Sequence, residues 1–484
     1  MTTTTTTNTS SLYLQQFYLE CLSHASYLVG DTSTGIAAVV DPQRDISLYL
    51  DDAKEHGLTI KYVIETHFHA DFLSGHLELA EAVGAEIVFG RAAQGRTDFP
   101  IRAMSNGEKI LLGDSQGSSD AAQCVELEFL ETPGHTPESM SVVVRTHPGA
   151  EPHAVFTGDT LFIGDVGRPD LLAAVGHTAE DLGRMLYDSL HTKLLALPDT
   201  TLVYPAHGAG SACGKNLSTA TVSTIGEQRT TNYALAPMTQ DQFVEVVTEG
   251  QSTAPMYFLF AATTNRKARD TFHEDRPLEA MSLQTVLDAQ QAGTVVVDTR
   301  DDGEFAVGHL KGSINVGLGG RFAEYTGEVV AAGTPIVIVA EPGKEREATI
   351  RLARIGFDTV VGYLADPVRV FVENPKVVQA ASRLTAPEFD ARRSELHDLH
   401  RDVQLVDVRN PGEFKLGTIA GAKHIDLPSL TRRLGELDPA KPTVVFCAGG
   451  YRSSIAASTL RANGFTDVSD ILGGYNAWSA LVRH

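Results

Sequence analysis

The sequence predicts an α/β protein of about three domains. Its 484 residues are enough for about three domains of roughly 150 residues, each with its own core. In the first half, short apolar runs alternate with amphipathic stretches, as strands and helices do in α/β folds. The second half contains an internal repeat, which indicates a duplicated domain.

The elements of the first half follow from apolar periodicity. Strands are expected at residues 36–40, 60–64 and 154–157, and helices at 46–56 and 74–83. The stretch from about residue 250 to 276 lacks clear periodicity, so we expect a domain boundary there.

The repeat has a long and constant offset. Residues 298–305 match residues 407–414 at 407 − 298 = 109, and residues 308–312 stay in register with 417–421. Both copies contain strand-like apolar runs and close with a strand, a loop, a helix and a glycine–phenylalanine pair. These patterns predict two small α/β domains with parallel sheets.

Composition excludes several classes of protein. The formal net charge of −22, with no stripe of Lys and Arg, argues against nucleic-acid binding. Four cysteines do not make a disulfide framework, so we expect a reducing, cytoplasmic location. The sequence has no uncharged apolar run of about 18 residues, so we do not expect a membrane span. The Thr-rich residues 1–10 lack the features of a secretory signal and are expected to be disordered.

Four separated motifs predict a metal site. A single His-x-His pair also occurs among ordinary polar loop residues, but four such elements in order favour metal binding. Most follow predicted strands, where loops on a rigid scaffold place functional groups. The candidate ligands are His67, His69, Asp71, His135, Asp159 and His207.

The segment from His67 to Phe72 resembles the two-metal hydrolases of the metallo-β-lactamase family, which implies an αββα sandwich. Those hydrolases have a histidine at position 72, and the resemblance implies that it binds a second ion together with Asp71 and His207, with Asp159 bridging. Phe72 cannot ligate a metal. The chain is therefore expected to hold a single ion.

The metal motifs and residues 158–171, GDTLFIGDVGRPDL, also resemble the persulfide dioxygenases. That resemblance implies one Fe(II) per chain on His67, His135 and Asp159, the two-His, one-carboxylate arrangement of mononuclear iron oxygenases. It implies that His69, Asp71 and His207 surround the ligands and tune the metal. Arg168 would meet an anionic thiol substrate, although a structural salt bridge is the alternative.

The second repeat contains a cysteine loop. A predicted strand leads into Cys447-Ala-Gly-Gly-Tyr-Arg-Ser453, and a helical pattern follows at once. Backbone N–H groups and the helix N-terminus are expected to lower the pKa of the Cys447 thiol and to hold an anion, helped by Arg452. A buried structural cysteine is one alternative. A phosphatase loop is another, but it has five residues between Cys and Arg, and this loop has four.

This loop resembles the active loop of the rhodanese sulfurtransferases. By that resemblance Cys447 accepts a sulfane sulfur as a persulfide, and Arg452, Gly449 and Gly450 help to bind thiosulfate or another anionic donor. The first repeat reads IVIVAEPGKER at residues 336–346 and has no cysteine. It cannot form a persulfide, so we expect a structural role, with anion binding at Lys344 and Arg346 left open.

Taken whole, the chain resembles a persulfide dioxygenase fused to two rhodanese-like domains. We expect the domains at residues 11–260, 275–375 and 382–484. The resemblance implies that a small persulfide (of glutathione, coenzyme A or a similar thiol) and O2 give sulfite, and that Cys447 exchanges sulfur among persulfide, sulfite and thiosulfate. A homo-oligomer is expected.

Two other functions remain open on the sequence. A hydrolase of the hydroxyacylglutathione type would use zinc to activate water and would share most of the metal motifs. A sulfur carrier or sensor would form a persulfide at Cys447 while its metal domain had no turnover. Cys213 either faces the substrate or simply packs in the core.

Overall fold

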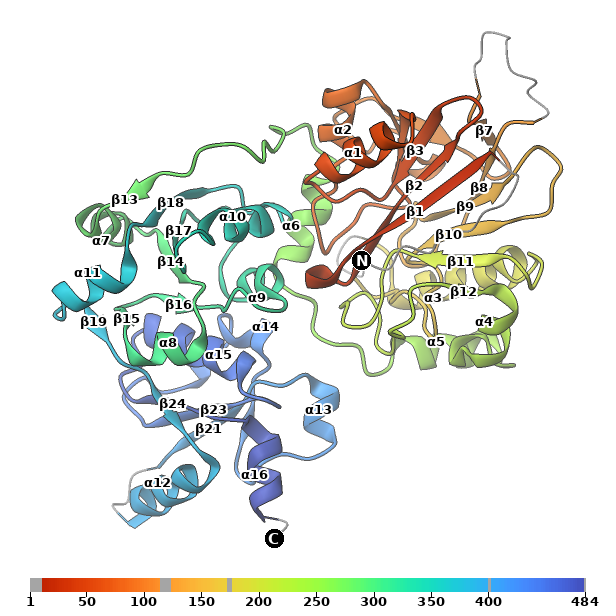
Figure 1. Cartoon of the computed structure of the whole chain (residues 1–484). Coiled ribbons are helices and arrows are strands. Elements are labelled where there is room, and N and C mark those ends of the chain that lie inside the picture. The colour runs from red at the N-terminus through yellow and green to blue at the C-terminus, as the bar shows by residue number, and fades with distance from the viewer. Residues whose placement is uncertain (1–10, 114–122, 172–175, 399–401, 483–484) are drawn as a thin grey trace. The chain divides into compact units, whose positions relative to one another are not determined.

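The chain folds into two compact units (Figure 1). The computed structural model describes residues 11–113, 123–171, 176–398 and 402–482. One unit comprises Met1–Gln251 with Ala261–Phe272, and the other comprises Ser252–Phe260 with His273–His484. The units therefore divide within the aperiodic stretch at residues 250–276. The predicted lead at residues 1–10 lies outside the described residues.

The first unit contains two six-stranded sheets. The first sheet has the order β1-β2-β3-β4-β5-β6, with strands Leu12–Leu19, His24–Asp31, Ile36–Val40, Thr59–Ile64, Glu86–Gly90 and Arg102–Met104. The second has the order β12-β11-β10-β9-β8-β7. From β7 to β12 its strands are Lys109–Leu111, Glu126–Glu131, Met140–Arg145, Ala154–Gly158, Leu202–Pro205 and Ser223–Thr224.

Helices cover the outer faces of both sheets, which confirms the predicted αββα sandwich (Figure 1). Helices α1 (Ser47–Glu55) and α2 (His76–Val83) pack on the first sheet through a shared apolar cluster. Helices α3 (Ala179–Ser189) and α5 (Gln240–Thr248) pack on the second sheet. Helix α4 (Ile225–Thr231) also belongs to this unit, and α6 (Tyr257–Thr264) contains the point at which the two units divide.

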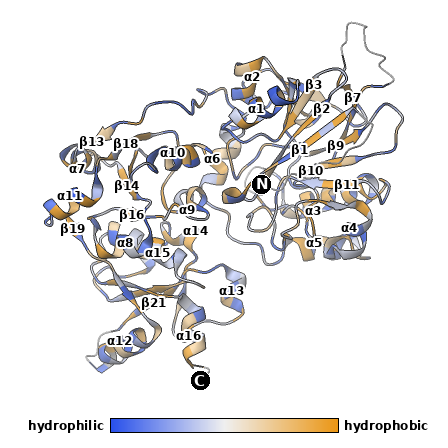
Figure 2. Ribbon diagram, in the orientation of Figure 1, coloured by the Kyte–Doolittle hydropathy of each residue, from blue (hydrophilic) through white to orange (hydrophobic). Residues whose placement is uncertain are grey.

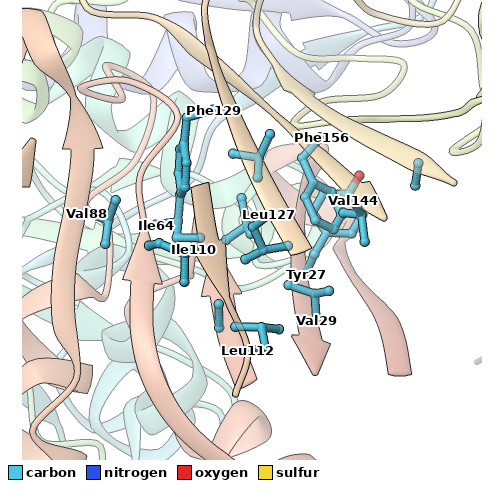
Figure 3. Close-up of a cluster of buried hydrophobic side chains, with 14 of the residues drawn as sticks. Tyr27, Val29, Ile64, Val88, Ile110, Leu112, Leu127, Phe129, Val144 and Phe156 are labelled. Carbon is cyan, nitrogen blue, oxygen red and sulfur yellow. The ribbon is translucent and has the colours of Figure 1, made fainter. Parts of the chain in front are cut away.

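The core of the sandwich lies between the two sheets (Figure 3). Alternate residues of a strand face the same side, so Tyr27 and Val29 of β2 enter this core together. Phe129 of β8 and Phe156 of β10 enter it from the second sheet, and the rings of Tyr27 and Phe156 have centroids 4.7 Å apart. The chain leaves β4, β8, β10 and β11 just before His67, His135, Asp159 and His207. This is how the sandwich positions the candidate site.

The second unit contains two five-stranded parallel sheets, as the repeat predicts. The first has the order β13-β18-β17-β14-β16, with β13 Ala280–Met281, β14 Val295–Asp298, β16 Ile314–Asn315, β17 Ile336–Val339 and β18 Val360–Leu364. The second has the order β20-β24-β23-β21-β22, with β20 Ser382–Leu384, β21 Gln404–Asp407, β22 Lys423–His424, β23 Thr443–Phe446 and β24 Val468–Ile471. Strands β15 (His309–Leu310) and β19 (Val378–Gln379) form a small antiparallel pair.

Helices separate these strands. In the first copy they are α7 Leu283–Gln291, α8 Asp302–Val307, α9 Phe322–Val329, α10 Glu345–Ala353 and α11 Pro367–Glu373. In the second copy they are α12 Ala386–Asp398, α13 Pro411–Lys415, α14 Leu427–Leu430, α15 Tyr451–Ala462 and α16 Gly474–Val482. Helices such as α11 and α12 carry both hydrophobic and hydrophilic stretches (Figure 2). Within the described ranges, none of the helices is both long and apolar enough to cross a bilayer.

The two copies also repeat a buried ion pair. Arg300 and Asp298 lie 2.6 Å apart, and Arg409 and Asp407 repeat this pair at 2.6 Å. In each copy the same arginine donates a second hydrogen bond to a glycine carbonyl eight residues further on. The equivalent contacts at an offset of 109 residues agree with a duplicated domain.

Replacing Phe156 with alanine tests the sandwich core. The Phe156 side chain is 1% exposed, so Phe156→Ala is expected to destabilise the first unit by about 3–5 kcal/mol through lost burial and a cavity. Native-state hydrogen exchange of the β9 and β10 amides measures this loss. Val83→Ala, at a side chain that is 41% exposed, is the control and is expected to change stability by about 0.5 kcal/mol or less. Equal effects of the two substitutions would contradict the assigned core.

Candidate metal centre and cysteine loop

Three predicted ligands converge at one end of the sandwich. The Nε2 atoms of His67 and His135 lie 3.8 Å and 3.3 Å from Oδ2 of Asp159. One ligand atom from each residue lies within 4.8 Å of the other two, and all three side chains are buried. This spacing suits three donors around one ion.

The ligand atoms have the environment that a metal site requires. Nε2 of His67 and both carboxylate oxygens of Asp159 are buried and have no hydrogen-bond partner among the described residues. Such atoms are rare in native proteins unless an ion or water satisfies them. The opposite ring nitrogens are held, because Nδ1 of His67 lies 3.0 Å from Thr66 Oγ1 and Nδ1 of His135 lies 2.9 Å from the Arg168 carbonyl. These contacts orient both Nε2 atoms, so the residues fit a bound metal.

Burial sets the protonation of the ligands. Burial lowers the pKa of His135 to about 4, and burial and neighbouring histidines hold the pKa of His67 well below its usual value. Both rings are therefore neutral at pH 7, as ligation requires. Burial raises the pKa of Asp159 to about 6, and burial likewise raises that of Asp71 to about 6. A cation is the natural counter-charge for these carboxylates.

His69 belongs to a buried network beside the three ligands. Its Nε2 lies 3.0 Å from Asp41 Oδ1 and 3.3 Å from Glu65 Oε2. Burial opposes protonation, but these two carboxylates raise the pKa of His69 well above its usual value. Asp41 also accepts the Thr66 N–H (2.7 Å) and hydroxyl (2.8 Å). Sequence reasoning missed Asp41 and Glu65, although each directly follows a strand, β3 or β4.

The other predicted residues line the position of a second ion. His207 Nε2 lies 3.3 Å from Asp71 Oδ2 and 3.5 Å from Asp159 Oδ1. Ligand atoms of His69, Asp71 and His207 also lie within 4.8 Å of one another. The ring of Phe72 closes this region, with its centroid 4.3 Å from the His69 ring and 4.0 Å from the His24 ring. His24 is fully buried and was not singled out in the sequence.

Arg168 and Cys213 have partners inside the protein. The Arg168 guanidinium donates two hydrogen bonds to Asp170, at 2.6 Å and 2.7 Å, which is the salt bridge that the sequence left open. Its substrate contact stays a prediction. Cys213 is 1% exposed and belongs to a group of possible ligands with Asp159 and His207. Burial, with the charges of Asp71 and Asp159, raises the pKa of its thiol well above the usual value.

The cysteine loop has the geometry that its sequence predicts. Cys447 directly follows β23, and α15 begins at Tyr451. The Gly450 N–H donates to Cys447 Sγ at 3.1 Å, and the Ser453 hydroxyl donates to it at 3.6 Å. Gly450 has φ 111°, a conformation that favours glycine. Both groups thus lie next to the sulfur of Cys447, and the Ser453 hydroxyl also lies 2.9 Å from the Gly450 carbonyl.

Arg452 is paired with a residue that sequence reasoning missed. Its two terminal nitrogens lie 2.7 Å and 2.8 Å from the carboxylate oxygens of Glu413 on α13. The pair is 39 residues apart in the chain, and no local pattern links its members. An anionic donor at Cys447 would therefore share Arg452 with Glu413.

The first repeat has no nucleophile at the equivalent place. Ala340 follows β17 where Cys447 follows β23. Lys344 pairs with Glu347 at 2.9 Å, and Arg346 donates to the Glu274 carbonyl. Both cations that were considered for anion binding thus have partners within the protein.

Comparisons with known proteins match the metal domain and the two repeat copies to separate families. The model of the Metallo-beta-lactamase superfamily matches residues 19–207, and that of the Rhodanese-like domain matches residues 282–369 and 392–481. Persulfide dioxygenase ETHE1 of Bos taurus is 32% identical over 248 residues, covering 50% of this chain and 83% of that protein. The chain belongs to the metallo-beta-lactamase superfamily. Its sandwich is homologous to persulfide dioxygenases and is followed by two rhodanese-like domains.

Two further relatives bear on the metal domain. The cytoplasmic hydroxyacylglutathione hydrolase of Arabidopsis thaliana is 37% identical over 195 residues, covering 40% of this chain and 66% of that protein. The crystal structure of a metallo-beta-lactamase from Staphylococcus aureus subsp. aureus COL superposes with a TM-score of 0.64 at 31% identity, covering 73% of this chain and 98% of that one. The family and the clustered ligands imply a bound metal.

Metal affinity is expected to depend on the protonation of Asp159. Its pKa is about 6, whereas His67 and His135 are already neutral at that pH, so protons compete with the metal at the carboxylate. Affinity for a divalent ion should be constant above about pH 7 and fall about tenfold per pH unit below pH 6. Competition with a chromophoric chelator measures it.

Asp159→Asn is the matched control for this titration. It keeps the shape of the side chain but cannot titrate, so its weaker affinity should show a shallower pH dependence. A wild-type affinity that stays constant down to pH 4 would contradict the assignment of Asp159 as a ligand.

Proposed function

We propose that the first unit is an Fe(II)-dependent persulfide dioxygenase and that the domain of Cys447 is a sulfurtransferase. The observation that carries the proposal is the buried cluster of His67, His135 and Asp159 beside the apolar wall of Phe72, in which His67 Nε2 and both Asp159 oxygens have no hydrogen-bond partner among the described residues. Two histidines and one carboxylate suit mononuclear non-haem iron. The homology to persulfide dioxygenases supports the same metal and substrate.

The residues around the metal have different roles. His67, His135 and Asp159 would hold one Fe(II), which supplies the redox chemistry that joins O2 to sulfur. Thr66 and the Arg168 carbonyl orient the two histidines. The His69 ring, held by Asp41 and Glu65, lies next to the site. Phe72 supplies no ligand for a second ion, and its ring packs against that of His24.

The proposed net reaction balances with one water. A thiol persulfide R–S–SH, O2 and H2O give R–SH, sulfite and two protons. Glutathione and coenzyme A are candidate carriers of the persulfide. The loops around the metal do not distinguish between them.

At Cys447 the proposed chemistry is sulfur transfer. The Cys447 thiolate attacks the outer sulfur of thiosulfate, the S–S bond breaks, and sulfite leaves with its electron pair. A thiolate R–S⁻ then attacks the outer sulfur of the Cys447 persulfide and releases the Cys447 thiolate. The reverse sequence converts persulfide and sulfite into thiosulfate. Either direction connects the two active units through sulfite and the small persulfide.

A zinc-dependent thioester hydrolase is the second candidate. The group of His69, Asp71 and His207 favours it, because these residues lie where a second ion would bind. The hydrolase of Arabidopsis thaliana is also a relative of this chain. Phe72 opposes this function, since it removes a ligand and puts a ring against His69.

Oxygen consumption tests the proposed dioxygenase. Protein loaded with Fe(II) is expected to consume one O2 per glutathione persulfide and to release sulfite. Asp159→Ala should reduce this rate at least about a hundredfold, because it removes a ligand to the metal. Cys447→Ser leaves the metal site intact and should keep the initial rate. Thioester hydrolysis with two bound zinc ions and no O2 uptake from any small persulfide would refute the proposal.

Phe72→His tests why the chain would hold one ion. The imidazole can supply the missing ligand next to Asp71 and His207, so zinc content is expected to rise from one towards two per chain. Persulfide-dependent O2 uptake should fall about tenfold or more as the open positions are lost. Phe72→Leu retains an apolar wall and should bind one ion. One ion in both variants would contradict this role of Phe72.

A further inference from the structure

The cysteine-free rhodanese-like domain keeps a cavity where its active site would be. The cavity measures about 620 Å³ and is lined by Thr299, Glu341 and residues 317–321 of that domain. Equivalent backbone hydrogen bonds place Val316 and Leu318 where Ile425 and Leu427 lie in the other copy, at an offset of 109 residues. Tyr451, which belongs to the cysteine loop of the other copy, forms one wall. The two copies therefore share this cavity.

The hydroxyl of Tyr451 binds the floor of this cavity. It donates to the carbonyls of Gly317, at 2.7 Å, and Gly319, at 3.1 Å. From the other side, Arg351 on α10 donates to the carbonyls of Leu318 and Gly320. The four successive carbonyls thus alternate between a partner in their own domain and a partner in the cysteine loop. We name residues 317–320 the socket.

Helix α15 makes further buried contacts with the cysteine-free domain. The Ser458 hydroxyl accepts the Asn315 N–H at 3.0 Å, and the Ser454 hydroxyl donates to Asn315 Oδ1 at 3.1 Å. The rings of Tyr451 and Tyr325 meet edge to face, with centroids 5.5 Å apart. The first turns of α15 are therefore anchored outside their own domain.

We propose that the vacated active site of the cysteine-free domain is a socket for Tyr451, and that this contact positions the Cys447 loop for sulfur transfer. Tyr451 is a positioning residue because it directly follows Gly450, whose N–H donates to Cys447 Sγ, and directly precedes Arg452. It is also the first residue of α15. Its hydroxyl thus fixes the end of the helix that faces the thiolate.

This role rests on the proposed sulfurtransferase, and it explains why the first copy has no cysteine. A substrate of a nucleophile at Ala340 would have to bind in a cavity that Tyr451 already partly fills. The socket requires close approach of a phenol to bare carbonyls, and the two socket residues that accept from Tyr451 are both glycines. The copy without a cysteine then positions the loop that carries out sulfur transfer in the other copy.

The alkylation of Cys447 tests the proposal independently of turnover. Iodoacetamide reacts with the thiolate, so the rate against pH, followed on the Cys447 peptide by mass spectrometry, reports its pKa. Tyr451→Phe removes only the hydroxyl and is expected to raise the midpoint by about one pH unit and to lower kcat/KM for thiosulfate about tenfold. Persulfide-dependent O2 uptake should not change.

Arg351→Lys approaches the same socket from the cysteine-free domain. It changes no residue of the sulfurtransferase domain, but it weakens the hydrogen bonds to the carbonyls of Leu318 and Gly320. The midpoint of Cys447 alkylation should therefore rise, as in Tyr451→Phe. Ser458→Ala is the matched control. It removes one hydroxyl from the same contact, and it should lower thermal stability while keeping the midpoint.

The outcomes separate the possibilities. Raised midpoints in both Tyr451→Phe and Arg351→Lys, with that of Ser458→Ala unchanged, support the socket. They do so even if the wild type transfers no sulfur, in which case the proposed sulfurtransferase alone fails. Wild-type midpoints in both socket variants, or equal shifts in all three, overturn the proposal, because Tyr451 would then be only a packing contact.

Discussion

The burial of the Asp159 carboxylate is the constraint on which the metal domain depends. Both of its oxygens are buried, and three histidines and the Cys213 thiol surround it. A carboxylate in this position is costly unless a cation balances it. The sandwich can hold the arrangement because strands from both sheets end at the same place and each ring is fixed from behind. A bound metal then stabilises the folded protein as well as serving its chemistry.

One expected reactive side chain is absent from the metal domain, and one is absent from the first rhodanese-like domain. At the metal, Phe72 replaces a ligand with an apolar ring, which leaves one complete set of donors next to an incomplete one. In the duplicated half, Ala340 stands in place of a nucleophile, and the emptied pocket receives Tyr451. In the duplicated half, the two copies keep equivalent parallel strands before this position. Function therefore depends on which side chains fill a conserved geometry.

Sequence reasoning succeeded where the signal is local. Apolar runs predicted β3 at residues 36–40 and β4 near 60–64, and the repeat predicted both parallel sheets. Motif order predicted a metal site, and the resemblance to persulfide dioxygenases selected His67, His135 and Asp159, whose ligand atoms lie close together. The partners of these groups could not be predicted, because Asp41 reaches Thr66 and Glu413 reaches Arg452 only through tertiary packing. The same holds for Tyr451, whose acceptors lie 132 and 134 residues away.

Anomalous diffraction from crystals of the Fe(II)-loaded protein would test the central claim most directly. Data collected above and below the iron edge locate each ion among the side chains. The account predicts one iron peak per chain, within bonding distance of His67 Nε2, His135 Nε2 and Asp159, and no peak between Asp71 and His207. Two metal peaks bridged by Asp159 would contradict a single-metal site and would favour the hydrolase.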